Sequence, residues 1–180
     1  MRRAASALVV LAGIILASPA PARAADSFVS EYRFGLLYHD AGLFGRRKEH
    51  GADGNFEVLF ESPGFLHWIG APRPHLGIEV STAEVTSKAY LGLTWNFVFF
   101  ERYYAGFSLG GAVHDGHIRT NLTNRKELGS RFLFRESIEA GVIFAERHTL
   151  SVMLSHVSNA KLGVKNEGMD SLGLRYGYRF

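Results

Sequence analysis

From residue 28 onward, apolar side chains alternate with polar or small ones at a period of two. In residues 28–39, Tyr32, Phe34 and Leu36 share one parity, whereas Glu31 and Arg33 share the other. Successive side chains of a β-strand point to opposite faces, so this period predicts strands. The pattern recurs in seven further segments, which are residues 55–61, 75–81, 91–97, 105–114, 135–142, 150–154 and 171–180. The sequence therefore predicts an all-β fold.

The composition favours a barrel that spans a membrane. Aromatic residues make up 13% of the chain and there are 20 glycines, yet the mean hydropathy is only +0.01. Lipid-facing and lumen-facing residues alternate in such barrels, so their hydropathies cancel. Single-chain bacterial barrels also have an even number of strands. We expect an eight-stranded antiparallel transmembrane β-barrel, in which segments 55–61 and 75–81 are the shortest strands.

The connections alternate between long and short. Long polar loops are expected at 40–54, 115–130 and 159–169, with a shorter one at 82–88, all at one end of the barrel. Turns at 101–102 and 145–147 close the other end, as is typical of outer-membrane barrels. The segment 62–74 is long for a turn, and its Phe65, Trp68 and Ile69 are expected at the membrane interface.

The first 24 residues predict a cleaved secretory signal peptide, which leaves residues 25–180 as the barrel domain. Arg2 and Arg3 precede an apolar run at residues 7–17, and an Ala-x-Ala cleavage signal ends at Ala24. The three arginines of this segment account for the charge of +3, so the remaining chain is formally neutral and no nucleic-acid partner is expected. With no cysteine, the chain has no disulfide, thiolate metal site or cysteine nucleophile.

Most charged residues of the strands share the parity that would face the lumen. We interpret them as an ion-pair network that fills a narrow barrel rather than as a glycosidase carboxylate pair. They are Glu31, Arg33, Glu57, Glu61, Glu79, Arg135, Glu139, Arg175 and Arg179. Glu136 has the outward parity and is expected near a rim or at a β-bulge. The pairs His39-Asp40 and His114-Asp115 are interpreted as solvated groups at loop edges.

Three polar residues fall on the lipid-facing parity of the last two strands. His156 and Ser158 follow Leu154 on one strand, and Asp170 precedes Leu172 on the next. The loop 159–169 joins the two strands, so all three residues are expected together on the outside of the barrel. A polar group that faces hydrocarbon is costly unless it is partnered. Their gathering at one place therefore indicates a site.

These residue types fit a serine hydrolase. Histidine acts as a general base towards the Ser158 hydroxyl, and Asp170 orients the imidazole. Asn159, Asn166 and backbone N–H groups of the loop are candidates for the oxyanion donors. From spacing alone the alternative stays open, in which His156 is an interfacial residue and Ser158-Asn159 a plain turn.

The stretch Ser155-His156-Val157-Ser158-Asn159-Ala160 resembles the signature of the outer-membrane lipid A 3-O-deacylase (PagL-type) family, also called acyloxyacyl hydrolases. Asn166, Gly168 and Asp170 and the closing Leu-Arg-Tyr-Gly-Tyr continue the likeness. The resemblance implies that His156 and Ser158 are catalytic and that Asn166 lines the oxyanion site. The family acid, usually glutamate, maps onto Asp170, with Glu167 as the alternative.

The resemblance implies an outer-membrane esterase that removes an acyl chain from lipid A without metal or cofactor. Basic loop residues would then contact the lipid phosphates or, alternatively, be ordinary solvated charges; they are Arg46, Arg47, Lys48, Lys161 and Lys165. A homodimer is left open. The competing hypotheses are a small adhesin or structural barrel of the outer membrane, and a soluble lipocalin-like barrel with its aromatic parity inside.

Overall fold

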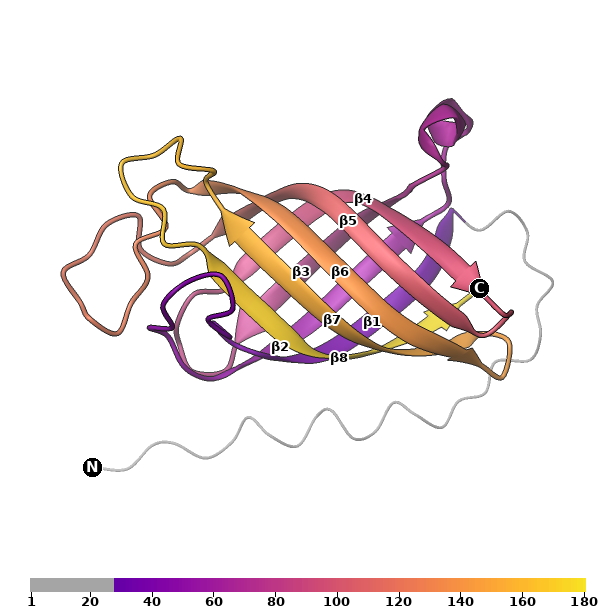
Figure 1. The fold of residues 1–180 in the computed structure, drawn as a ribbon, viewed down its shortest axis with the longest axis horizontal. Helices are drawn as coiled ribbons and strands as arrows, with labels where there is room; N and C mark the ends of the chain where they lie inside the picture. Colours follow the sequence, from indigo (N-terminus) through magenta and orange to yellow (C-terminus); the bar gives the residue numbers. More distant parts are fainter. Residues whose placement is uncertain (1–27) are drawn as a thin grey trace.

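The chain folds into a closed antiparallel barrel of eight strands (Figure 1). The computed structural model describes residues 28–180, so the predicted signal peptide at 1–24 lies outside the described residues. The strands are β1 (Val29–Tyr38), β2 (Ala52–Phe60), β3 (Arg73–Ser81), β4 (Lys88–Phe99), β5 (Tyr103–His114), β6 (Phe132–Phe144), β7 (His148–Ser158) and β8 (Met169–Arg179). Both the fold class and the strand number predicted from the alternation are confirmed.

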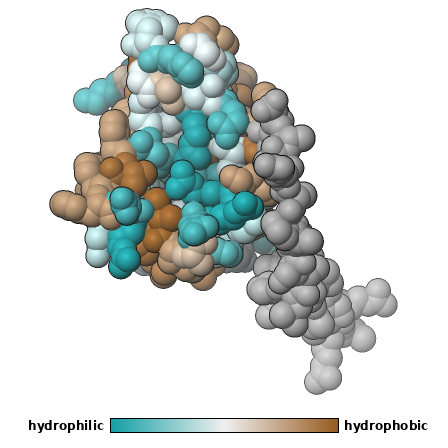
Figure 2. All heavy atoms as spheres, turned by 90° about the vertical axis from the view of Figure 1, so that its right-hand side faces the viewer, coloured by the Kyte–Doolittle hydropathy of each residue, from teal (hydrophilic) through white to brown (hydrophobic). Residues whose placement is uncertain are grey.

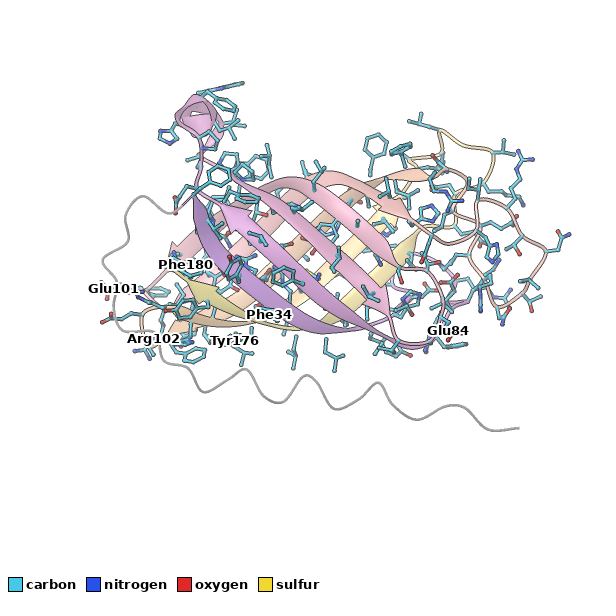
Figure 3. All side chains as sticks on the ribbon, turned by 180° about the vertical axis from the view of Figure 1, so that it is seen from behind. Phe34, Glu84, Glu101, Arg102, Tyr176 and Phe180 are labelled. Carbon is cyan, nitrogen blue, oxygen red and sulfur yellow. The ribbon has the colours of Figure 1, made fainter. Side chains whose placement is uncertain are left out.

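Long loops gather at one end of the barrel, which we call the loop end. They are residues 39–51, 82–87, 115–131 and 159–168. The other end, the turn end, carries the short β4–β5 and β6–β7 connections and the C-terminus (Figure 1). Figure 3 shows this separation, with Glu84 at the loop end and Glu101 and Arg102 at the turn end.

The long connection between β2 and β3 contains a short 3-10 helix, η1 (Gly64–Ile69). None of its residues is buried, and Phe65 and Trp68 are 74% and 85% exposed. The indole N–H of Trp95 on β4 donates to the Ile69 carbonyl at 2.8 Å and fixes the end of η1 to the barrel wall. Within residues 28–180, the structure has no helix with the length and apolar character to cross a membrane.

The two sides of the wall differ as the alternation predicts. Phe34 is 52% exposed on the outside, whereas Glu31 and Arg33 are 1% and 2% exposed in the lumen. The end view in Figure 2 shows hydrophilic residues in the middle and hydrophobic ones beside them. The outer surface is apolar and aromatic, which suits lipid contact. The lipocalin-like alternative is therefore wrong, because it requires the opposite orientation.

Ion pairs fill the lumen. The guanidinium of Arg33 lies 2.8 Å from Glu31, 3.2 Å from Glu139 and 3.4 Å from Glu57. Arg175 pairs with the same Glu57 and Glu139. Paired charges are the condition under which a narrow barrel can bury them. Glu61 departs from the prediction, because it lies beyond the end of β2 and is exposed at the mouth of the turn end.

A buried polar cluster at the loop end contradicts the expectation of solvated groups at His39-Asp40. His39, Asp40 and Glu49 are all 0% exposed. The His39 ring bridges Glu49 at 3.0 Å and Asp53 at 2.7 Å. His114 is buried too, although Asp115 is exposed as expected. We call His39, Asp40, Glu49 and Asp53 the loop hub.

The loop hub fixes three loops to one another. Glu49 accepts the backbone N–H groups of Thr86 at 3.1 Å and Lys126 at 2.9 Å, which belong to the second and third loops. Asp40 pairs with the Lys126 ammonium at 3.1 Å. Burial raises the pKa of Glu49, but these hydrogen bonds and the one from His39 outweigh burial and hold the pKa at about 2. These contacts hold the first loop against the second and third loops.

Candidate active site

His156 on β7 and Asp170 on β8 stand opposite each other in the strand register. Nδ1 of His156 lies 2.5 Å from Oδ1 of Asp170. The Asp170 carboxyl is 2% exposed, while the imidazole is 19% exposed and reaches the outer surface. A buried carboxylate bonded to Nδ1 fixes the ring so that Nε2 is the nitrogen free to take a proton. The sequence-predicted histidine and acid are therefore brought together.

Ser158 ends β7, two residues beyond His156 and on the same outward face. Its hydroxyl oxygen accepts the Ala160 N–H at 3.4 Å, and the two side chains of His156 and Ser158 are not hydrogen-bonded to each other here. The chain turns sharply after Ser158, since Ala160 and Lys161 have φ values of 51° and 63°. This turn directs the Ala160 N–H back towards the serine.

The first loop completes the surroundings of Asp170. The Phe44 N–H donates to Oδ2 of Asp170 at 2.9 Å, and the Ala41 N–H donates to the Asp170 carbonyl at 2.8 Å. The Phe44 ring meets the His156 ring edge to face at 5.6 Å. Sequence reasoning missed this role because Phe44 is 126 residues from Asp170 and carries no motif.

Gly168 lies directly against the imidazole of His156. A Cβ at this position would be 2.8 Å from Cε1 and 3.3 Å from Nε2 of His156. Its φ of +60° also lies in the left-handed region, where glycine is favoured. Glycine at position 168 thus keeps space beside the proton-accepting edge of the histidine.

The loop residues proposed for the site divide into two groups. Both donated hydrogen bonds of the Asn159 amide go to carbonyls, those of Leu128 and Lys165. Asn166 accepts the Asn159 N–H through Oδ1 at 2.9 Å, next to Ser158. This geometry favours a positioning role for Asn159 and leaves Asn166 as the side-chain amide candidate beside Ser158.

Glu167, the alternative acid, bonds to residues of two other loops. Its carboxylate accepts the Glu127 N–H at 2.7 Å and pairs with Lys48 at 2.6 Å. Burial raises the pKa of Glu167, but the hydrogen bonds from Lys48 and from the Glu127 N–H outweigh it, so the net shift is downward. Those contacts keep Glu167 in an interloop bridge, whereas Asp170 faces His156.

Glu136 on β6 is a further outward-facing carboxylate beside the site. In the register it stands directly across from His156, on the side opposite Asp170, and it is exposed. The pairing of β6 with both neighbours continues unbroken through this position, so of the two predicted alternatives, a rim position or a β-bulge, the β-bulge is wrong. The sequence signal for Glu136 was its break with the parity of its strand. A carboxylate on the lipid-facing side is costly unless it has a partner or a function.

The inner side of the same two strands is closed. Val157 and Met169 pair in register, are each 1% exposed, and belong to an apolar cluster with Tyr90 and Leu133. This cluster seals the lumen behind the site. A substrate must therefore approach His156 and Ser158 from the outer surface of the barrel.

A family model and a curated relative point to the same family. The family model for lipid A 3-O-deacylase (PagL) matches residues 64–179. The chain is 31% identical over 80 residues to the lipid A deacylase PagL of Bordetella bronchiseptica, a match that covers 44% of this chain and 43% of that protein. The matched part thus spans less than half of the curated relative.

Solved structures share the barrel. The crystal structure of the outer-membrane enzyme PagL superposes with a TM-score of 0.62 at 17% identity, over 84% of this chain and 100% of that one. The N-terminal β-barrel domain of Pseudomonas aeruginosa OprF gives a TM-score of 0.53 at 12% identity, over 84% and 98%. These two likenesses show the fold. Because the family model matches more than half of the sequence, the chain belongs to the lipid A 3-O-deacylase (PagL) family.

Proposed function

We propose that this protein is an outer-membrane esterase that hydrolyses an ester-linked 3-hydroxyacyl chain of lipid A through Ser158, His156 and Asp170. The observation that carries the proposal is the 2.5 Å contact between His156 Nδ1 and Asp170 Oδ1, on the outward face and next to Ser158. The family supports the substrate class. A purely structural or adhesive barrel has no need of a buried acid and a partly exposed histidine on its lipid-facing wall.

The reaction proceeds through an acyl-enzyme. His156 Nε2 takes the proton from the Ser158 hydroxyl as its oxygen attacks the ester carbonyl. Asp170 holds the ring and stabilises its charged form. The tetrahedral intermediate collapses, and the alcohol of the lipid leaves with the proton from His156. Water, deprotonated by His156, then attacks the acyl-serine and releases the fatty acid.

The developing oxyanion needs hydrogen-bond donors. The Ala160 N–H, which is 3.4 Å from the Ser158 hydroxyl oxygen, supplies the first donor. The Asn166 side chain, held by the Asn159 N–H through Oδ1, supplies the second donor from its amide nitrogen. Removing a single donor of this kind costs roughly 10²–10³ in kcat.

The position of the site suits a substrate held in a membrane. His156 and Ser158 lie near the loop end of an apolar wall, and the lumen behind them is sealed. Lipid A therefore reaches the site by lateral diffusion in the outer leaflet. Of the basic loop residues, Arg46 and Lys161 are exposed and available to phosphates, whereas Lys48 pairs with Glu167 and Arg47 stacks on Tyr38.

The test is to express the protein in a bacterium whose lipid A is known and to weigh that lipid A by mass spectrometry. We expect the loss of one hydroxyacyl mass with the wild type and none with Ser158→Ala or His156→Ala. The control is Ser62→Ala, in the turn-end connection far from the site. Unchanged lipid A beside correctly inserted wild-type protein would overturn the proposal.

A further inference from the structure

The short helix η1 (Gly64–Ile69) stands out from the side of the barrel near the turn end (Figure 1). Its sequence, Gly-Phe-Leu-His-Trp-Ile, contains no Asp, Glu, Lys or Arg. Phe65 and Trp68 are its two most exposed large side chains. Neighbouring exposed apolar side chains mark a surface that contacts a membrane or another protein. We therefore ask which of these η1 meets.

The attachment point of η1 lies on the lipid-facing side of the wall. The Trp95 indole of β4 donates to the Ile69 carbonyl at 2.8 Å, and its ring lies 6.0 Å from the Phe107 ring of β5. Beyond Trp95, Phe97 and Phe99 continue the outward parity to the end of β4 and are exposed. At the usual rise per residue and strand tilt, Trp95 is roughly 10 Å from the turn end. Thus η1 is attached within the apolar wall.

The strands that flank η1 are short. β3 begins at Arg73, which pairs with Thr94, whereas β4 continues from there to Phe99. β2 and β3 have nine residues each, compared with 12 in β4 and 13 in β6. A wall that is too short for the membrane leaves a hydrophobic mismatch. The connection that carries η1 adds apolar side chains to this shorter side.

Backbone N–H groups around η1 are bonded within the connection itself. The Leu66 N–H donates to the Pro63 carbonyl at 2.9 Å, and the Gly70 N–H donates to the His67 carbonyl at 3.1 Å. The Ala71 N–H donates to the Leu66 carbonyl at 3.2 Å. Apolar surroundings require such internal pairing, because they offer no water to a peptide group. The backbone of η1 is therefore compatible with contact to lipid.

We propose that η1 is a membrane anchor that lies in the leaflet at the turn end, with Phe65 and Trp68 inserted between the phospholipid headgroups and the upper acyl chains. Lipid is the occupant of this surface because η1 is attached to a wall that itself faces lipid. Tryptophan favours this depth, since its ring is apolar and its N–H is polar. The anchor fixes the depth of the shorter side of the barrel, and it does not depend on hydrolysis.

The first test uses electron paramagnetic resonance of spin labels, because the chain has no cysteine that would compete for the label. Single labels are placed by His67→Cys in η1, Leu91→Cys on the exposed wall and Thr123→Cys in an exposed loop. The labelled proteins are refolded in vesicles of phosphatidylethanolamine and phosphatidylglycerol. Each label is then tested for collision with oxygen, which concentrates in hydrocarbon, and with a nickel chelate, which stays in water.

We expect the label at position 67 to behave like the wall label. It should collide with the nickel chelate at least about fivefold less often than the label at position 123, because a polar complex is excluded from apolar surroundings. Its collisions with oxygen should be more frequent than those at position 123.

The second test removes the two rings. Phe65→Ser and Trp68→Ser are combined with the label at position 67, and heat-dependent gel mobility verifies that the barrel is folded. Nickel collisions should rise at least about fivefold, because the helix has lost the apolar area that holds it in the leaflet. The matched control combines Leu162→Ser with Val164→Ser, which removes two similarly exposed apolar side chains from the fourth loop. This control should leave the label at position 67 unchanged.

The collision rates distinguish the occupants of this surface. A label at position 67 that meets the nickel chelate as often as the label at position 123 would place η1 in water and overturn the proposal. Low collision rates with both reagents would also overturn it, since they indicate cover by a second copy of the chain or by another protein. So would unchanged protection in the folded Phe65→Ser, Trp68→Ser variant. Protection from nickel, access to oxygen and dependence on both rings together support the anchor.

Discussion

The Phe44 N–H donates to Oδ2 of Asp170 at 2.9 Å. The loop of the first hairpin, between β1 and β2, therefore holds an acid of the last hairpin, between β7 and β8. The other carboxylate oxygen is bonded to His156. Both oxygens of Asp170 are therefore engaged, and the carboxylate has one orientation. The Phe44 ring adds an edge-to-face contact with the imidazole.

Replacing Phe44 with alanine removes the ring and keeps the N–H. Such aromatic contacts contribute about 0.5–1.5 kcal/mol, so ester hydrolysis should slow roughly two- to tenfold. The measurement is kcat of the purified variant, with Leu43→Ala as the control because Leu43 is an exposed neighbour in the same loop. Equal rates for Phe44→Ala and Leu43→Ala would show that the Phe44 ring has no role in hydrolysis.

Three carboxylates near the site should differ sharply in importance. Asp170→Asn should lower kcat by as much as about 10⁴, because the amide favours the wrong tautomer of His156. Glu167→Gln and Glu136→Gln should have far smaller effects, since neither hydrogen-bonds to His156. Lipid A mass spectrometry and ester kinetics measure all three. A larger loss from Glu167→Gln than from Asp170→Asn would reverse the assignment of the acid.

Gly168→Ala should impair catalysis without unfolding the barrel. The added methyl would lie 2.8 Å from Cε1 of His156 and must displace the ring. A displacement of about 1 Å can cost roughly 10² in rate. Gly64→Ala, which has open space around it, is the matched control. Wild-type activity in Gly168→Ala would mean that the loop, and not the histidine, moves aside.

The loop hub should be most stable in mildly acidic solution. Burial lowers the pKa of His39, but its bonds to Asp53 and Glu49 outweigh burial and raise the pKa above 6.5. These bonds therefore stabilise the loop hub below pH 6.5, and the stabilisation is lost as the pH rises through the raised pKa. The pKa of Glu49 is lowered to about 2, so its hydrogen bonds stabilise the loop hub above pH 4.5. This stabilisation is lost as the pH falls towards 2. Hydrogen-exchange protection of the Thr86 and Lys126 amides should fall on both sides of this window. His39→Gln should abolish the alkaline fall; protection that still falls there would assign it to another group.

The lumen network should depend strongly on Arg33. Arg33→Met leaves Glu31, Glu57 and Glu139 with one fewer cation, and breaking a buried pair in this way costs about 3–5 kcal/mol. Urea unfolding of the refolded barrel in lipid vesicles measures the change in the free energy of unfolding. Arg179→Met, at the partly exposed mouth of the turn end, should cost less than about 1 kcal/mol. Similar losses in the two variants would contradict a network centred on Arg33.

Strand positions could be predicted from the sequence because the alternation of apolar and polar residues records which side of the barrel wall each residue faces. Glu31 and Phe34 show this, as do the nine-residue lengths of β2 and β3, the shortest strands, as expected. The site residues on strands followed from the same parity, since His156 and Asp170 are fixed by register. Glu136 could be flagged by parity, but its place beside His156 needed the β6–β7 pairing.

Loop contacts could not be predicted in this way. Glu49 bonds to Lys126 across 77 residues, and no local period records such a contact. Asp40 and His39 looked like solvated loop-edge groups because the sequence does not show that three loops fold over them. The role of Phe44 was hidden for the same reason, although Asp170 itself could be identified.

β8 pairs with β1, and the two N–H donors that hold Asp170 come from the loop that follows β1. These two hydrogen bonds to Asp170 therefore depend on the closure of the barrel between β1 and β8. A chain in which β1 and β8 have not paired keeps His156 and Ser158 on β7 but lacks these two donors to Asp170. We therefore expect the proposed hydrolysis to require the closed barrel.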